Sequence, residues 1–269
     1  MDKIGFIGGG NMAEALIRGI IEAKVYPPEN VRVSDVRGER LEYLAREYRV
    51  STTTDNRKLA TDADILVLSV KPQNMTGVLE EIKNSVNADA LIISIAAGVR
   101  TTKVSAILGQ MPIVRVMPNT PALIGQGASA LYANDLAKPL LRKAETIFAS
   151  VGLTVFVDDE DLIDAVTAVS GSGPAYYFLL MEEMIKAGIE MGLPADIAKD
   201  LVLQTARGAA MLALEADKSG ESPADLRRKV ASPKGTTEAA LEVFAKGNFA
   251  ALVNAALKRA HQRSKELSN

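Results

Sequence analysis

The stretch GFIGGGNMAEALIRGI, residues 5–20, decides the fold because it joins a buried-strand pattern to a helical pattern through three consecutive glycines. Gly8, Gly10 and Ala13 fit the pattern G-x-G-x-x-G/A. In that pattern the first small residue permits a tight turn, the second lets backbone approach a pyrophosphate, and the third lets helix and strand pack closely. The stretch therefore predicts a dinucleotide-binding turn with the phosphates at the helix N-terminus.

Short β-branched runs alternate with helical patterns through the first half of the chain, which is typical of βαβ units with a parallel sheet. We predict strands at residues 3–8, 31–35, 65–70, 91–95, 113–117 and 153–157. After DDEDLID, residues 158–164, the strand patterns end and Ala/Leu/Met-rich segments follow. We therefore expect an α/β protein with a Rossmann-type, mostly parallel sheet in residues 1–160 and an all-helical domain in residues 161–269.

The second half of the chain contains several predicted helices, and the first of them is unusually apolar. These helices are expected at residues 174–191, 194–214, 223–230, 238–245 and 249–266. The residues from Ala175 to Met181 are apolar nearly all round, so this helix must be covered on every side. A helical interface shared by two subunits and a central helix within one subunit both satisfy this requirement.

Composition excludes several classes of function. The 269 residues carry 31 basic and 33 acidic side chains, which gives no electrostatic reason to expect nucleic acid or an anionic membrane as partner. We find no secretory leader pattern and no apolar run of membrane-spanning length, so we expect a cytoplasmic protein. Because the chain has no cysteine and a single histidine, we predict no metal site. That residue, His261, is expected to be a solvated helix residue.

Two residues at the end of the second predicted strand point to opposite cofactors. Asp35 stands where an acidic residue holds the adenosine ribose hydroxyls of NAD. Arg37 can instead pair with the 2′-phosphate of NADP, unless it is a solvated loop residue.

The loops that follow three predicted strands are expected to face one crevice, because ligands bind beyond the carboxyl ends of strands in an open α/β sheet. Lys71, Asn119 and Thr120 can contact the ribose, phosphate or carboxamide of a cofactor there, or else cap the strand ends. The loops read SVKPQN at residues 69–74, AAGV at residues 96–99 and MPNTPA at residues 117–122.

A turn of small residues precedes one of the predicted helices. In ASPKGTTEAAL, residues 231–241, Thr236 or Thr237 can cap the helix. Ser232 and Gly235 lie in the turn before it, where backbone N–H groups are free. Such a cup suits a carboxylate, although an ordinary capped helix start would read the same way.

Together these segments resemble the pyrroline-5-carboxylate reductases, the family of the last step of proline synthesis, from Lys3 to Leu267. The combination of VKP, MPNTP, SGSGPAY and SPxGTT is far more specific than the glycine pattern. The resemblance implies a Rossmann domain followed by an all-α dimerisation domain, a homodimer through that domain, and a decamer built of dimers as a larger assembly. The matching segments are GFIGGGNMAEAL, LSVKPQ, SIAAGV, RVMPNTPALIGQGASALYAN, LIDAVTAVSGSGPAYYFLLMEEM and ASPKGTTEAAL.

The resemblance also implies which residues bind the cofactor, NADPH or alternatively NADH. These residues lie in the glycine turn, at the end of the second strand and in the later loops. They are Gly8, Gly9, Gly10, Asn11, Met12, Ser34, Asp35, Arg37, Asn56, Val70, Lys71, Pro72, Ala96, Ala97, Gly98 and Asn119.

The same resemblance places the substrate, 1-pyrroline-5-carboxylate, in the turn before residue 238. Its carboxylate would be held by Ser232, Gly235, Thr236 and Thr237, and Thr237 is the catalytic position near the ring nitrogen. Lys234 departs from the family, which usually has Gly there. Reduction to L-proline needs a hydride on the C=N carbon and a proton on nitrogen, and a protonated imine already brings that proton. A strong acid is therefore not required, in keeping with the single histidine.

Two other interpretations stay open. The β-hydroxyacid dehydrogenases and imine reductases share this architecture, and those acting on C–O bonds generally need a lysine or acid on the helical domain. Lys186 and Lys199 lie on predicted helices there. A non-catalytic dinucleotide sensor would bind NADPH and leave it unoxidised, although such a protein has no evident use for the SPKGTT turn.

Overall fold

The computed structural model describes residues 2–268, so the two end positions of the predicted domains, residues 1 and 269, lie outside it. The chain forms two compact units. The first, here called the sheet unit, comprises the chain up to Pro174 together with the chain from Arg259 onward. The second, the helical unit, is Ala175–Lys258. A domain boundary near residue 160 stays a prediction.

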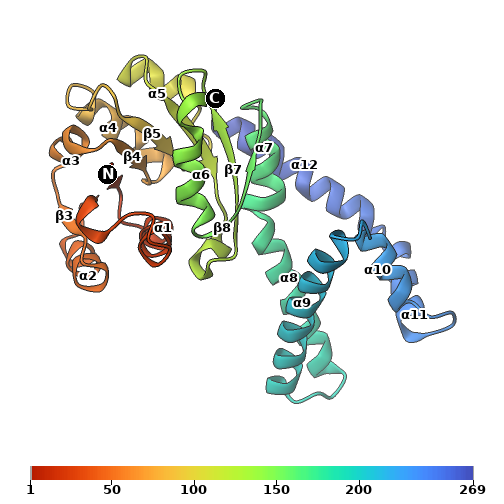
Figure 1. Ribbon diagram of the computed structural model, residues 1–269. Coiled ribbons are helices and arrows are strands. Elements are labelled where there is room, and N and C mark those ends of the chain that lie inside the picture. The colour runs from red at the N-terminus through yellow and green to blue at the C-terminus, as the bar shows by residue number, and fades with distance from the viewer. Residues whose placement is uncertain (1, 269) are drawn as a thin grey trace. The chain divides into compact units, whose positions relative to one another are not determined.

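The described residues of the sheet unit form one eight-stranded sheet with the order β3-β2-β1-β4-β5-β6-β7-β8 (Figure 1). Neighbours from β3 to β6 are parallel, β7 is antiparallel to β6, and β8 is parallel to β7. Chain order reverses direction at β1, which puts the expected ligand crevice at the carboxyl ends of β1 and β4. The strands are β1 (Ile4–Ile7), β2 (Val31–Ser34), β3 (Ser51–Thr53), β4 (Ile65–Leu68), β5 (Leu91–Ser94), β6 (Ile113–Met117), β7 (Gly127–Ala133) and β8 (Gly152–Phe156).

The predicted Rossmann-type sheet and its six strands are confirmed, but β3 and β7 were not predicted. β3 is three polar residues, Ser51–Thr53, too short for an alternating pattern to show. β7 reads GASALYA, and its glycine and alanines have low strand propensity. It is a strand because it pairs with β6 on one side and β8 on the other.

Helices cover both faces of the sheet and bury one apolar core on each. The core on one face joins the strands to α1 (Asn11–Glu22), α2 (Gly38–Tyr48) and α6 (Leu141–Ala149). The core on the other face joins them to α3 (Asn56–Asp62), α4 (Pro72–Ile82) and α5 (Thr101–Leu108). This packing fixes the strand ends, and therefore the loops that follow them, on a rigid scaffold.

The remaining helices lead into, form and leave the helical unit. None of the helices in the described part of the chain combines the length and apolar character needed to cross a membrane. The helices that lead into, form and leave the helical unit are α7 (Leu162–Val166), a π-helical turn (Thr167–Gly171), α8 (Gly173–Glu190), α9 (Ala195–Asp217), α10 (Pro223–Val230), α11 (Thr236–Lys246) and α12 (Phe249–Ser268). His261 lies half-buried on α12 rather than fully solvated.

The apolar helix α8 is not covered by its own unit. Tyr177 and Phe178 are more than half exposed, and Leu179 is as well. The interpretation of α8 as a central helix within one subunit is therefore wrong, and an interface with a second chain is the interpretation that remains.

Candidate active site

The glycine turn between β1 and α1 is shaped to receive an anion. Gly8 has φ 98°, and a β-carbon there would lie 2.8 Å from the Ser69 carbonyl oxygen, so only glycine fits. Beside Gly10, no heavy atom of the described chain lies within 4 Å of the position a β-carbon would take. No described side chain caps α1, whose first N–H groups therefore stay free. The open space and the free N–H groups fit a pyrophosphate.

Asp35 is fully occupied by its own neighbours. Its Oδ1 accepts bonds from the backbone N–H and the Nε of Arg37, at 3.0 and 2.9 Å. Its Oδ2 accepts bonds from Arg37 Nη2 at 3.0 Å and from Gly9 N–H at 2.8 Å. Burial raises the pKa of Asp35, but these hydrogen bonds outweigh it and lower the pKa to about 2. A carboxylate has about four acceptor positions, and here all are used.

Arg40, which the sequence analysis missed, ties α2 to the glycine turn. Its Nε donates to the Gly9 carbonyl oxygen at 2.5 Å, and its Nη2 donates to Glu14 at 2.5 Å. Tyr43 and Tyr48 also donate to Glu14, at 3.0 and 2.8 Å. Burial raises the pKa of Glu14, but the hydrogen bonds from Arg40, Tyr48 and Tyr43 outweigh burial, so the pKa is lowered. In the sequence, only its position three residues after Arg37 indicated that Arg40 could lie near the glycine turn.

Ser34 and Asn56 lie together beside β2. The Ser34 hydroxyl donates to Asn56 Oδ1 at 2.7 Å, and Asn56 Nδ2 donates to Glu81 at 2.8 Å. Asn56 is the first residue of α3. A ligand that contacts the Asn56 side chain therefore has to share or replace these bonds.

The loop after β4 is held against the glycine turn by Ser69. Its hydroxyl donates to the carbonyl oxygens of Ile7 and Gly8, at 3.0 and 2.7 Å. Lys71 is the N-cap residue of α4, and Pro72 is its first residue. Both are exposed, so the structure places them beside the turn and open to a ligand.

Asn119 joins three elements. Its Oδ1 accepts the Ala128 N–H at 2.9 Å, and its Nδ2 donates to the Ser170 hydroxyl at 3.2 Å. The side chain thus links the end of β6 to β7 and to the π-helical turn. The strand-capping role is observed, while contact between Asn119 and a cofactor stays a prediction. Thr120 begins the short 3-10 helix that follows.

The turn before α11 differs from its prediction in detail. Gly235, not a threonine, is the N-cap residue, and Thr236 and Thr237 are the first two helical residues. A β-carbon on Gly235 would lie 2.9 Å from the Ser232 backbone carbonyl oxygen, a close approach that favours glycine at this position. The left-handed residue is instead Lys234, with φ 59°.

Free backbone donors remain at the start of α11. Lys234 N–H donates to Glu238 at 2.6 Å and Gly235 N–H to the Ser232 carbonyl at 3.0 Å. Helix geometry leaves the N–H groups of Thr236 and Thr237 without a partner inside the helix. These two groups and the nearby hydroxyls are suited to a carboxylate.

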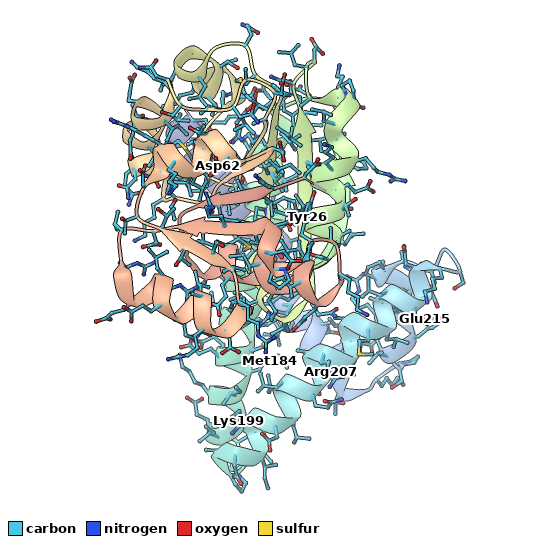
Figure 2. All side chains as sticks on the ribbon, turned by 60° about the vertical axis from the view of Figure 1, so that its left-hand side comes forward. Tyr26, Asp62, Met184, Lys199, Arg207 and Glu215 are labelled. Atoms are coloured by element: carbon cyan, nitrogen blue, oxygen red, sulfur yellow. The ribbon has the colours of Figure 1, made fainter. Side chains whose placement is uncertain are left out.

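The two lysines of the alternative dehydrogenase interpretation lie in the helical unit. Lys186 donates to Glu182 and Glu183 at 2.6 and 2.8 Å, and these bonds raise its pKa. A lysine held charged in this way is a poor proton acceptor. Lys199 lies on α9 and approaches Asp200 at 3.7 Å (Figure 2).

Two family models match separate parts of the chain. Residues 160–267 match the family described as pyrroline-5-carboxylate reductase dimerisation. Residues 3–98 match the family described as NADP oxidoreductase, coenzyme F420-dependent.

The similarity to individual proteins extends over the whole chain. A pyrroline-5-carboxylate reductase of Pseudomonas aeruginosa is 48% identical over 268 residues, which is 99% of this chain and 97% of that protein. A solved pyrroline-5-carboxylate reductase of Coxiella burnetii is 43% identical with a TM-score of 0.91, covering 100% of this chain and 99% of the other. The Plasmodium falciparum pyrroline carboxylate reductase with NADP bound is 32% identical with a TM-score of 0.88, covering 100% and 98%.

Proposed function

The chain belongs to the pyrroline-5-carboxylate reductase family, and from this premise we propose that it reduces 1-pyrroline-5-carboxylate to L-proline with NAD(P)H. The observation that best supports this proposal is that the similarity extends over 99% of the chain and includes the turn before α11. In that turn Gly235 lies close against Ser232. This turn is the part of the molecule that a dinucleotide sensor has no use for.

The cofactor belongs at the carboxyl ends of β1, β2, β4 and β5. When bound, the reduced nicotinamide supplies the hydride. The glycine turn and the free N–H groups of α1 hold the pyrophosphate, and Ser34, Asp35, Arg37 and Asn56 surround the adenosine ribose. Val70 to Pro72 and the loop of residues 96–98 line the remainder. The NADP named with the Plasmodium falciparum structure supports this assignment.

NADPH is the preferred cofactor in this proposal. Asp35 has no acceptor position left for a ribose hydroxyl, because Arg37 and Gly9 occupy all of them. Asp35 therefore orients Arg37 instead of binding ribose. The guanidinium keeps three N–H groups beyond those that Asp35 accepts, and it is 61% exposed, so it can bind a 2′-phosphate.

The substrate carboxylate is bound by Ser232 and by the backbone and hydroxyls of Gly235, Thr236 and Thr237. The substrate imine arrives protonated, so the protein's tasks are to orient it, exclude water and bind its charge. The Thr237 hydroxyl oxygen accepts a hydrogen bond from the protonated ring nitrogen, and Thr237 is half-buried. It orients the reacting group and needs no strong acidity.

Replacing Thr237 tests its part in the reaction. We expect Thr237→Ala to lower kcat about 10-fold or more, because one hydrogen bond made in the transition state is lost. NADPH binding should be nearly unchanged, since the cofactor residues lie elsewhere in the chain. Steady-state kinetics and an NADPH titration measure the two effects. Unchanged turnover would remove Thr237 from the mechanism.

The proposed activity is tested by mixing the purified protein with 1-pyrroline-5-carboxylate and either NADPH or NADH in parallel cuvettes. Loss of reduced-nicotinamide absorbance that depends on the imine is the expected result, and it should be faster with NADPH. Cofactor binding without oxidation in either cuvette would instead favour the sensor interpretation.

A homodimer is the proposed functional unit, and the match to a dimerisation family together with the exposed α8 supports it. A decamer built of five dimers is the proposed larger assembly, and the cytoplasm is the proposed location. Sedimentation velocity distinguishes a dimer from a decamer. Fractionation of the source cells tests the location.

A further inference from the structure

The loop of residues 96–98 is closed on one side by the end of the chain's last helix. Gly98 has φ 70°, and it is buried. A β-carbon there would lie 2.9 Å from both the β-carbon and the carbonyl oxygen of Leu267, in the last turn of α12. The contact is made by the backbone and the β-carbon of Leu267, and the residue as a whole is more than half exposed.

That last turn is anchored by a buried carboxylate. The Ser264 hydroxyl donates to Asp164 Oδ1 at 2.6 Å, and the Ser268 hydroxyl donates to the same oxygen at 3.3 Å. Asp164, on α7, is 0% exposed and Ser264 is 4% exposed. A hydroxyl bound to a carboxylate away from water is among the stronger hydrogen bonds in proteins.

The other end of the loop is held by a second carboxylate, four residues before Asp164. Glu160 accepts the Thr101 N–H at 2.8 Å and the Thr101 hydroxyl at 2.7 Å. Arg115 Nη1 donates to Glu160 at 3.1 Å, and Arg115 Nη2 lies 3.9 Å from Asp164 Oδ1. The buried Arg115 guanidinium thus lies beside both carboxylates, and Arg100 Nη2 also lies 3.9 Å from Asp164 Oδ2. Glu160 holds Thr101, and Asp164 holds α12.

We propose that Asp164 and Ser264 are positioning residues for the reduction, because they hold α12 against Gly98 and so keep residues 96–98 in the conformation that receives the cofactor. This inference rests on the proposed function for the contact between residues 96–98 and NADPH. Glycine readily adopts other backbone conformations, so the loop depends on an external support to remain in this one. Neither Asp164 nor Ser264 needs to touch the cofactor.

Asp164 and Ser264, with the last turn of α12 that they hold against Gly98, are called the clamp below. The full-length variant Ser264→Ala tests the clamp. We expect the Kd and KM for NADPH to rise about 5- to 10-fold, with kcat changed less than about 2-fold, because only cofactor binding depends on the loop. The KM for the imine should not change. Amide hydrogen exchange of residues 95–99 should accelerate about 10-fold, because local opening costs less free energy.

Two matched variants separate the clamp from other effects. Ser219→Ala removes a hydroxyl that donates to the Ala216 carbonyl in the helical unit at 2.8 Å, and it should change none of these quantities. Asp164→Asn removes the charge but keeps an oxygen that accepts from Ser264. It should lower the thermal midpoint while leaving the KM for NADPH within about 2-fold. If Ser264→Ala does not fold, Ser268→Ala removes the 3.3 Å bond to Asp164 and the 3.0 Å bond to the Ser264 carbonyl oxygen, and it should raise the same KM about 4-fold.

The outcomes separate this inference from the proposed function. Unchanged NADPH affinity and unchanged exchange in Ser264→Ala would overturn the clamp, even if wild type reduces the imine. Faster exchange together with weaker NADPH binding supports the clamp and needs no turnover to be seen. Failure of wild type to reduce the imine, with those two changes present, would count against the proposed function alone.

Discussion

The sheet unit and the helical unit are built from similarly apolar sequence, yet they bury it very differently. In the described chain, nearly all of the buried apolar residues belong to the sheet unit, and Ala198 and Ala216 are those of the helical unit. The helical unit instead exposes large side chains along α8 and α9, such as Phe178 and Leu201. The sheet unit buries a core of its own, whereas the helical unit buries little and fits the proposed pairing with a second copy.

Polar groups show the same contrast. The sheet unit encloses charged residues, including Arg115 and Glu160, and pairs them. In the helical unit the ion pairs lie on the surface, as between Lys186 and Glu182. Surface pairs contribute little to stability, whereas a buried pair is costly to break. The two units should therefore respond to different substitutions.

The largest expected effect is on self-association through the helical unit. Phe178→Glu places a charge on an apolar surface of α8, and we expect the dimer to weaken about 1000-fold, since burying an unpaired charge costs several kcal/mol. NADPH should still bind to the variant. Leu136→Glu, at an exposed apolar residue of the sheet unit, is the control and should leave the dimer intact. Sedimentation equilibrium measures the dimer dissociation constants of the two variants. A Phe178→Glu variant that is as dimeric as wild type would contradict an interface at α8.

The next effect is on the stability of the sheet unit. Arg115→Met removes the buried guanidinium that pairs with Glu160 at 3.1 Å, and we expect a loss of about 3–5 kcal/mol in the free energy of unfolding. The control Arg142→Met removes an exposed pair with Glu145 and should leave the free energy of unfolding nearly unchanged. Urea unfolding measures both variants. A loss below about 1 kcal/mol for Arg115→Met would show that the cluster does not hold the unit together.

Cofactor choice comes next, at the edge of the sheet unit. Arg37→Ala should raise the KM for NADPH about 10-fold or more, because a charged hydrogen bond to phosphate is lost. The same change frees Asp35 to accept from ribose, so the KM for NADH should fall or stay constant. Equal increases in the two KM values would contradict the role of Asp35 as the residue that orients Arg37.

The smallest expected effect is acid sensitivity. The pKa of Asp35 is about 2 in the folded protein, below the value of about 3.9 in an unfolded chain. Its stabilisation is therefore complete above about pH 4 and is lost as the pH falls toward 2. Because Arg37 is largely exposed, we expect a contribution of only about 1 kcal/mol. Asp35→Asn should flatten the stability curve between pH 4 and 2, and an unchanged slope would contradict this origin.

Sequence patterns predicted the elements whose signals are local. The glycine turn, the apolar strands and the helix at Pro223–Val230 all follow from residue spacing and helix boundaries, and the structure confirms them. The small-residue strand β7 was missed because pairing, not propensity, makes it a strand. Lys234 also takes a left-handed conformation without being glycine, and the glycine usual at this position in the family was the one signal for it.

The missed parts of the candidate site depend on contacts between residues distant in the chain. The acidic run DDEDLID indicated a boundary, and yet Glu160 and Asp164 within it are buried because Arg115 and Ser264 meet them from other elements. The sequence predicted Gly98 as a cofactor-binding glycine. The structure adds that a side chain at this position would meet Leu267 of α12. Long-range pairing of this kind leaves no periodic trace in the sequence.

The most direct test of the account is to follow the hydride itself. The protein is given 1-pyrroline-5-carboxylate and NADPH in which both hydrogens on nicotinamide C4 are deuterium. The proline formed is analysed by mass spectrometry. The account predicts a single deuterium, on the ring carbon that was part of the C=N bond. Proline without deuterium, or no proline while the cofactor stays bound and reduced, would contradict the claim that this chain transfers hydride to the imine.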